Sequence, residues 1–169
     1  MTGMKLYLVR HGETLMNSLK KNQGWIDSDL TVEGIKTLKN NFVDNSIPEL
    51  DIIYCSDLGR TIKTLEVILP YLKFKDDELI EYSNLIRERF LGSLEGDSLP
   101  LTRQMLSTRG GYKNFNELIA KTSFWNFVDL TKEFDPTSLA ENFNEFSERI
   151  NHFLKETIKS AKEKNIAIF

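Results

Sequence analysis

The chain has 169 residues, with 22 Lys and Arg against 25 Asp and Glu and a formal net charge of −3 at pH 7. This length suits a single α/β domain, and the charges form no dense block of the kind that binds nucleic acid or membrane surfaces. No apolar run approaches the roughly 18 residues of a membrane-spanning helix, and the single cysteine, Cys55, excludes an intrachain disulfide. We therefore expect a soluble, cytoplasmic protein.

The first two predicted elements are a strand and a helix. An apolar run over 5–9 predicts a buried strand, which ends abruptly at the polar pair Arg10 and His11. Farther along, Thr31 is placed to cap a helix that runs to about Asp44. The apolar residues on one face of this helix are Ile35, Leu38 and Phe42.

A strand, a helix and a further strand are predicted next. The apolar run over 51–55 predicts the second strand, and Ser56 and Asp57 are placed to cap a helix that ends at Pro70. A third strand is predicted over 79–82 before a turn-rich stretch.

The second half of the chain has a weaker pattern at first. Within 99–135 we predict an aromatic-rich helix over 116–128. Apolar residues then recur every three or four positions from Leu139 to Ile158, which predicts a long amphipathic helix packed on a sheet. The apolar run over 166–169 predicts another buried strand. Alternating strands and helices indicate an α/β fold, with ligand chemistry at the carboxyl ends of the strands.

The sharpest functional signal directly follows the first strand. It reads Arg10-His11-Gly12-Glu13-Thr14, followed by Asn17. A histidine placed directly after a buried strand can be held rigidly, and Arg10 beside it offers a planar fork for phosphate oxygens. The pattern resembles the R-H-G-E-T-x-x-N motif of the histidine phosphatase superfamily, the phosphoglycerate mutase-like group.

Two further segments carry the resemblance and argue against a purely structural role for His11. Gln23-Gly24, followed by Leu-Thr-x-x-Gly at 30–34, resembles the Q-G…L-T-x-x-G segment of the family. The sequence S-D-L-G-R-T-I-K-T resembles S-D-L-x-R-A-x-x-T and places Arg60 in the first turn of a helix. Because free amides and the dipole at a helix N-terminus favour an anion, Arg60 would strengthen a phosphate site.

A third segment supplies an acidic candidate. The sequence R-E-R-F-L-G-S-L-E-G resembles the family segment whose first glutamate is the proton donor, which is Glu88 here. This role requires a pKa raised by partial burial or by nearby negative charge, so we expect Arg87 and Arg89 to face away. Glu141 with Arg149 has the spacing of the family G-E-S…R segment, although an acidic first turn of a long helix explains Glu141 equally well.

The resemblance implies a fold, a mechanism and a set of site residues. The fold would be a three-layer α/β/α sandwich with a mostly parallel sheet. His11 would attack phosphorus to form a phosphohistidine, while Glu88 protonates the leaving oxygen, and neither a metal nor a cofactor would be needed. The substrate-binding residues implied are Arg10, Asn17, Gln23, Gly24 and Arg60.

The family's second catalytic histidine follows a strand that corresponds to 166–169, and the only other histidine here, His152, falls within a predicted helix. We interpret His152 as a solvated side chain. On this basis 1–169 is expected to be one histidine phosphatase domain that is incomplete at its C-terminus and lacks its last strand or strands. The segment 97–135 is interpreted as a lid or substrate-specificity insertion.

Three activities fit these residues. Hydrolysis of phosphomonoesters ranks first, because 99–135 lacks the basic Trp-Arg-Arg insertion of cofactor-dependent phosphoglycerate mutases. A phosphoglycerate mutase is the second possibility, and a non-catalytic module that binds a phosphorylated ligand or a protein is the third. The expected partner is a small phosphorylated substrate rather than nucleic acid or a membrane.

Overall fold

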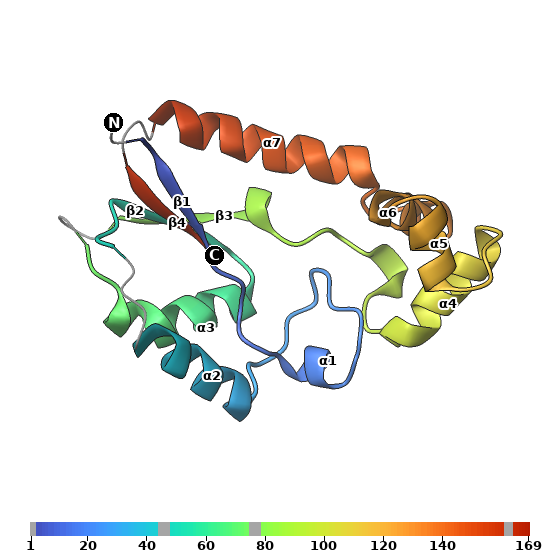
Figure 1. The fold of residues 1–169 in the computed structure, drawn as a ribbon, viewed down its shortest axis with the longest axis horizontal. Helices are drawn as coiled ribbons and strands as arrows, with labels where there is room; N and C mark the ends of the chain where they lie inside the picture. Colours follow the sequence, from blue (N-terminus) through green and yellow to red (C-terminus); the bar gives the residue numbers. More distant parts are fainter. Residues whose placement is uncertain (1–2, 44–47, 75–78, 161–163) are drawn as a thin grey trace. The chain divides into compact units, whose positions relative to one another are not determined.

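The computed structural model describes residues 3–43, 48–74, 79–160 and 164–169. Within these ranges the chain forms two compact units (Figure 1). Unit 1 comprises the described residues of 1–15, 27–87 and 150–169, and unit 2 comprises 16–26 and 88–149.

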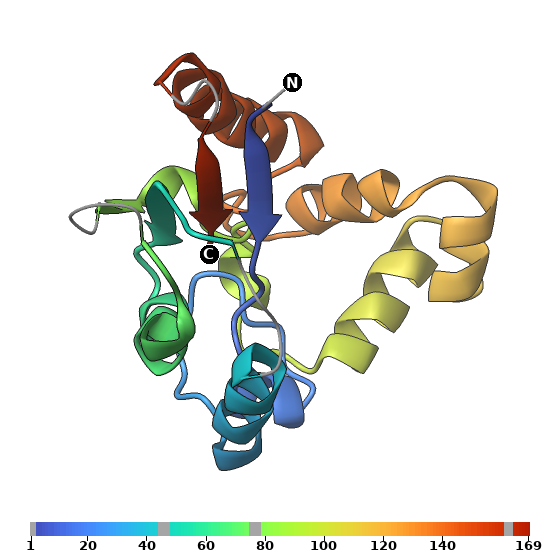
Figure 2. The same ribbon diagram turned by 60° about the vertical axis from the view of Figure 1, so that its left-hand side comes forward.

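A parallel sheet lies at the centre of unit 1. Its strands in the described part of the chain are β1 (Lys5–Leu8), β2 (Ile52–Ser56), β3 (Ile80–Ser83) and β4 (Asn165–Ile168), in the spatial order β1-β4-β2-β3. Figure 2 shows β1 and β4 side by side, and Leu6 and Ile52 both have Ile166 as their partner in register. All of these pairs are parallel, which confirms the predicted sheet. The prediction that β1 is buried is wrong, because β1 lies at the edge of the described sheet and its Leu6 and Leu8 side chains are exposed.

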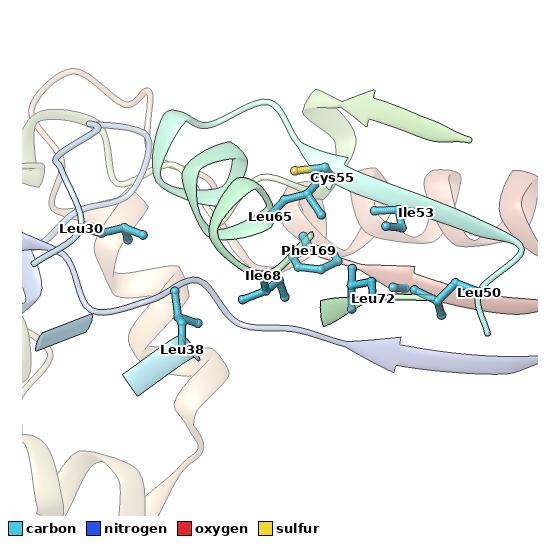
Figure 3. Packing of buried hydrophobic residues seen from close by; sticks show 10 residues of the cluster. Leu30, Leu38, Leu50, Ile53, Cys55, Leu65, Ile68, Leu72 and Phe169 are labelled. Atoms are coloured by element: carbon cyan, nitrogen blue, oxygen red, sulfur yellow. The ribbon is translucent and has the colours of Figure 1, made fainter. Parts of the chain in front are cut away.

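One face of the sheet is covered by two helices, α2 (Val32–Val43) and α3 (Gly59–Ile68). Their apolar side chains pack with the sheet residues in one cluster (Figure 3). Thr31 caps α2 as predicted, because its hydroxyl oxygen accepts the Gly34 N–H at 2.9 Å. The predicted end of this helix at Asp44 lies outside the described residues.

The other face of the sheet is covered by the part of α7 (Phe143–Ser160) that belongs to unit 1, which begins at Ile150. Phe153 packs edge-on against Tyr54 at 5.1 Å between ring centroids, in a cluster that includes Ile166. With α2 and α3 on the opposite face, this confirms the three-layer α/β/α arrangement.

The start of α7 is later than the sequence pattern predicted. The helix begins after Asn142 because the Asn142 side chain accepts the Glu145 N–H and the Glu145 carboxylate accepts the Asn142 N–H, both at 2.9 Å. Leu139 therefore precedes the helix, and it is exposed rather than part of the apolar face.

Unit 2 is mainly helical. Its helices in the described residues include α4 (Leu99–Arg109), α5 (Phe115–Lys121) and α6 (Phe124–Glu133), with a core around Leu106, Leu118 and Phe127. The single helix predicted over 116–128 is wrong, because the chain breaks at Ser123, whose hydroxyl oxygen accepts the Asn126 N–H at 3.3 Å and starts α6.

Short elements complete the described chain. They are α1 (Leu15–Ser18) and the 3-10 helices η1 (Leu69–Tyr71), η2 (Asn84–Ile86) and η3 (Gly92–Leu94). The helix predicted to run to Pro70 therefore ends as α-helix at Ile68 and continues as one 3-10 turn. None of the helices described is long and apolar enough to cross a lipid bilayer.

Candidate functional site

The predicted site residues divide between the two units. Arg10, His11 and Arg60 belong to unit 1, and Asn17, Gln23, Gly24 and Glu88 belong to unit 2. In unit 1, His11 lies in the loop after β1, at the carboxyl end of the strand, as the sequence predicted. Arg10 and Arg60 are close enough for their charges to act on its imidazole ring.

The His11 imidazole has a defined orientation. Its Nδ1 atom lies 2.8 Å from the Gly12 carbonyl oxygen. A carbonyl oxygen only accepts hydrogen bonds, so Nδ1 carries the hydrogen and donates it. The lone pair of the neutral ring is then on Nε2, which leaves this nitrogen as the nucleophile.

The environment of His11 favours its neutral form. Burial contributes most to lowering its pKa below the ordinary value of 6.5, and the positive charges of Arg60 and Arg10 lower it further. The hydrogen bond to Gly12 and the negative charge of Asp27 act in the opposite direction without reversing the shift. A neutral imidazole is the form that can attack phosphorus.

A buried threonine ties the His11 loop to α3. The Gly12 N–H donates to Thr64 Oγ1 at 3.0 Å, and the Thr64 hydroxyl donates to the Arg60 carbonyl oxygen at 2.8 Å. Thr64 is completely buried. A Cβ atom at position 12 would lie 2.6 Å from the side chain of Leu38, so a larger residue here would displace that side chain.

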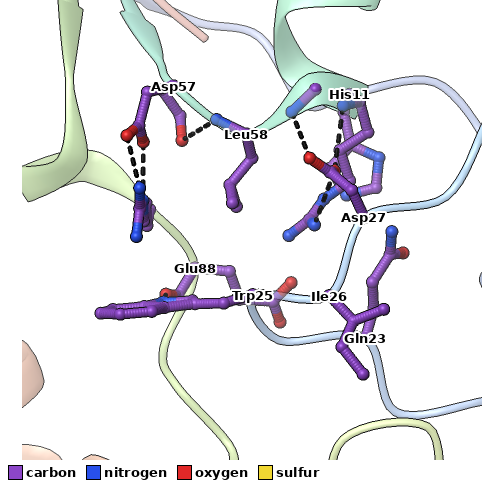
Figure 4. A network of polar contacts seen from close by, with 12 residues as sticks. His11, Gln23, Trp25, Ile26, Asp27, Asp57, Leu58 and Glu88 are labelled. Carbon is purple, nitrogen blue, oxygen red and sulfur yellow. Dashed lines mark hydrogen bonds and ion pairs between the residues drawn. The ribbon is translucent and has the colours of Figure 1, made fainter.

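The N-terminus of α3 is held by a residue that the sequence analysis did not select. The Asp27 carboxylate accepts hydrogen bonds from the Gly59 N–H and, at 3.1 Å, from the Arg60 N–H (Figure 4). It also lies 3.5 Å from the guanidinium of Arg60, whose side chain is only 1% exposed. The prediction that Ser56 and Asp57 cap this helix is wrong. The first two backbone N–H groups of the helix are bonded to the carboxylate of Asp27 instead.

Asp57 has a different partner. Arg87 binds its carboxylate through Nε at 2.6 Å and Nη2 at 2.5 Å (Figure 4). This forked ion pair lowers the pKa of Asp57, first through the hydrogen bond itself. The pair joins the chain after β2 to the chain after η2 within unit 1.

A pocket of about 410 Å³ opens beside the N-terminus of α3. Asp27, Arg60 and Lys63 are among its walls, so both signs of charge face it. Arg60 and Lys63 both belong to α3, so two cationic side chains of one helix border this space.

In unit 2, the predicted residues Gln23 and Gly24 are buried. Asn17 donates a hydrogen bond from its side chain to Gln23 Oε1 at 3.4 Å. Gly24 has a φ of +56°, and a Cβ atom there would overlap the carboxylate of Glu95. The need for glycine at position 24 is therefore explained by its backbone conformation and by Glu95.

Glu95 organises this part of unit 2. Its carboxylate accepts the backbone N–H groups of Trp25 at 2.7 Å, Ile26 at 3.0 Å and Leu91 at 3.1 Å. The side chain of Glu95 thus joins the segment after Gly24 to the segment after Glu88.

Glu88 is exposed, so the partial burial assumed for it from the sequence is wrong. Its carbonyl oxygen accepts the Trp25 indole N–H at 2.7 Å and Arg149 Nη2 at 3.2 Å. Arg149 is in turn bound by Glu141 in a forked pair, with both contacts at 2.7 Å. Glu141 precedes α7, so its role is this ion pair rather than an acidic first turn.

Comparison of the sequence with models of known protein families identifies the family. Residues 6–169 match the sequence model of the histidine phosphatase superfamily (branch 1). The chain belongs to this superfamily.

Curated relatives in the histidine phosphatase superfamily include phosphatases and a mutase. The chain is 37% identical over 106 residues to a probable phosphatase from Schizosaccharomyces pombe, a match that covers 62% of this chain and 48% of the relative. It is 36% identical over 111 residues to the fructose-2,6-bisphosphatase TIGAR from Bos taurus, covering 65% and 41%. A 2,3-bisphosphoglycerate-dependent phosphoglycerate mutase from Treponema denticola is 37% identical over 95 residues, covering 55% and 38%. The chain thus spans less than half the length of these relatives.

Solved structures agree with the superfamily fold. The crystal structure of a phosphoglycerate mutase from Bacillus anthracis has a TM-score of 0.84 and 29% identity, covering 99% of this chain and 74% of that one. A putative alpha-ribazole-5'-P phosphatase from Escherichia coli has a TM-score of 0.65 and 23% identity, covering 98% and 72%, and shows the same fold.

Sequence reasoning missed several residues that organise this histidine phosphatase chain. Asp27 lies in none of the quoted motifs, whereas Thr64 and Glu95 lie inside two of them without having been assigned a role. All three act through contacts with residues far away in sequence, which a local pattern does not show. His152, which we had set aside, is exposed on α7. Within the described ranges, no group of three or more His, Cys, Asp or Glu side chains is placed to hold a metal ion.

Proposed function

We propose that this protein hydrolyses phosphomonoesters through a phosphohistidine at His11, without a metal ion. The observation that carries the proposal is the state of His11. Its Nδ1 is bonded to the Gly12 carbonyl oxygen, and its lowered pKa keeps Nε2 available as a nucleophile. Arg10 and Arg60 supply positive charge beside the ring, as transfer of a phosphoryl group requires.

In the proposed reaction, the Nε2 lone pair of His11 forms a bond to phosphorus while the bond from phosphorus to the leaving oxygen breaks. Glu88 gives its proton to that oxygen, and the alcohol departs. Glu88 then takes a proton from water, whose oxygen attacks phosphorus and breaks the bond to Nε2, which releases phosphate and restores His11. Asn17, Gln23 and Gly24 complete the substrate-binding set in this proposal.

The test is p-nitrophenyl phosphate hydrolysis by the full-length protein in the presence of a chelator, combined with trapping of labelled protein. We expect an acid-labile phosphoryl label and turnover, both abolished by His11→Ala. His152→Ala is the matched control, because His152 is the other histidine and is exposed on α7. Turnover that survives His11→Ala would refute the proposal.

A phosphoglycerate mutase is the second candidate. The relative from Treponema denticola and the structure from Bacillus anthracis are both mutases, which favours this activity. We rank it lower because 99–135 lacks a basic Trp-Arg-Arg insertion. A mutase would label His11 from a bisphosphoglycerate and return the phosphoryl group to monophosphoglycerate faster than to water.

A binding module is the third candidate. Such a protein would bind a phosphorylated ligand but never acquire the label.

The substrate class and the setting follow from the same proposal. We propose a small phosphorylated substrate whose leaving group contacts 97–135, the segment that includes α4 to α6. A reducing cytoplasmic compartment suits the single cysteine. Replacing 97–135 with the same segment of a relative of known substrate should change the order in which the protein prefers phosphomonoesters. An unchanged order would mean that residues outside 97–135 determine the specificity.

A further inference from the structure

Two hydrogen bonds converge on one backbone atom of unit 2, the carbonyl oxygen of Glu88. The indole N–H of Trp25 donates at 2.7 Å, and Arg149 Nη2 donates at 3.2 Å. A carbonyl oxygen has two lone pairs, so these donors fill its capacity. They come from opposite ends of the unit's sequence, and the peptide that follows Glu88 is therefore held between distant segments.

The donor from Arg149 is itself fixed. Glu141 binds the guanidinium through Nε and Nη2, each at 2.7 Å, and both side chains are only 14% exposed. The same Glu141 carboxylate accepts the Phe90 N–H at 2.8 Å, and the Glu141 N–H donates to the Phe90 carbonyl oxygen at 2.9 Å. The Glu141–Arg149 ion pair therefore holds the main chain at both position 88 and position 90 through hydrogen bonds.

Trp25 is fixed from two directions. Its ring stacks on Phe90 with centroids 4.7 Å apart and an interplanar angle of 29°. Its backbone N–H is bonded to Glu95 at 2.7 Å. Figure 4 shows the indole ring beside Glu88. An indole held at the ring and at the main chain offers its N–H in one direction, so it constrains the carbonyl it binds.

We propose that Trp25 and the Glu141–Arg149 pair are positioning residues that fix the main chain of Glu88 and thereby direct its carboxyl group for proton transfer. This inference rests on the function proposed above. The side chain of Glu88 is short, so the position of its main chain limits where its carboxyl group can reach. Small displacements of a catalytic group are costly to the rate, because proton transfer requires heavy atoms within hydrogen-bond distance.

The test compares two substrates whose leaving oxygens differ in their need for a proton. Phenyl phosphate needs the proton, whereas 2,4-dinitrophenyl phosphate leaves readily as an anion. Trp25→Phe keeps the stacking ring and removes the indole N–H. We expect kcat/KM of the full-length protein to fall about tenfold for phenyl phosphate and less than about twofold for dinitrophenyl phosphate, a fraction of the full effect of a general acid. Arg149→Lys should show the same selectivity, because lysine cannot reproduce the fork to Glu141.

Three further variants make the result decisive. Glu88→Gln should show a larger selective loss, and adding Trp25→Phe to it should cost little more, because both changes act on one proton transfer. Tyr71→Phe, which removes the hydroxyl group of an exposed aromatic ring on η1 in unit 1, is the control and should leave both rates unchanged. Equal losses for both substrates in Trp25→Phe would overturn the positioning role while leaving the phosphatase intact. Wild-type protein that hydrolyses neither substrate and takes up no label would overturn both proposals.

Discussion

At the scale of single residues, the state of His11 predicts a pH dependence. Burial, followed by the charges of Arg60 and Arg10, lowers its pKa below 6.5. The protonated ring has no free lone pair, so kcat/KM should rise with pH through this lowered pKa and reach its plateau earlier than for an unperturbed histidine. Asp27 opposes the shift, so Asp27→Asn should move the acidic midpoint still lower.

The measurement is the pH profile of p-nitrophenyl phosphate hydrolysis for the wild type and Asp27→Asn. The ionisation of the substrate is common to both profiles, so a difference between their midpoints belongs to the enzyme. A midpoint that rises in Asp27→Asn would contradict the electrostatic account of His11.

Cys55 gives a second prediction at this scale. The thiol lies in β2 with no exposed surface, and burial raises its pKa to about 12, with the charge of Asp57 adding to the effect. Thiolate is the reactive form, so iodoacetamide should leave Cys55 unmodified in the folded protein and modify it in urea. Mass spectrometry measures both states. Rapid alkylation without denaturant would show that β2 opens readily.

At the scale of secondary structure, Asp27 should stabilise α3. Its carboxylate accepts the N–H groups of Gly59 and Arg60, and negative charge is favourable at a helix N-terminus. Replacing Asp27 with alanine should lower the free energy of unfolding by about 1 kcal/mol, the typical effect of losing an N-cap. Urea unfolding measures the change. Asp29→Ala removes an exposed carboxylate two residues away and is the control.

Local patterns predicted the elements whose apolar residues are regularly spaced. The strands β2 and β4 and the helices α2 and α7 have such patterns, because one face or both faces are buried in the apolar clusters of unit 1. The apolar run at β1 predicted the strand but not its exposure. The helix α4 has no such pattern. Two of its three buried residues, Thr102 and Ser107, are polar. In the sequence, the buried face of α4 therefore looks like a solvent-exposed face.

The break between α5 and α6 was missed for a different reason. Aromatic residues continue across it, with Phe115 before the break and Phe124 and Trp125 after it. The signals for two helices are the caps Asn114 and Ser123, whose side chains accept the N–H groups of residues three positions later. Cap residues were the better guide here than apolar spacing.

At the scale of the molecule, the sequence motifs identified the family but not the contacts that hold the motif residues in place. The matches around His11, Arg60 and Glu88 are short, and each lies next to a strand or a turn that local rules can predict. The contacts that hold them are Asp27 to Arg60, Thr64 to Gly12, and Arg149 to Glu88. Each of these joins segments more than 30 residues apart, which only tertiary structure brings together.

Asp135 should contribute strongly to the stability of the folded chain. This buried carboxylate accepts hydrogen bonds from Ser93, Thr137, Leu139 and Ala140, which ties η3 to the chain before α7. Burial alone would raise its pKa, but the bonds from Ser93, Ala140 and Thr137 outweigh burial and lower it. Asp135→Asn should therefore lower the free energy of unfolding at pH 7 by about 2 kcal/mol, the scale of hydrogen bonds to a charged group.

The same bonds predict how this contribution changes with pH. The folded pKa of Asp135 is lower than its ordinary value of 3.8, so as pH falls below 3.8 the unfolded chain takes up the proton first. The stabilisation is thus fully present above pH 3.8 and is lost as pH falls towards the folded pKa. Urea unfolding at pH 7 and pH 3 should show the difference between wild type and Asp135→Asn shrinking at the lower pH. Asp97→Asn, on an exposed residue, should show no such trend, and a constant difference for Asp135→Asn would mean that its geometry rather than its charge stabilises unit 2.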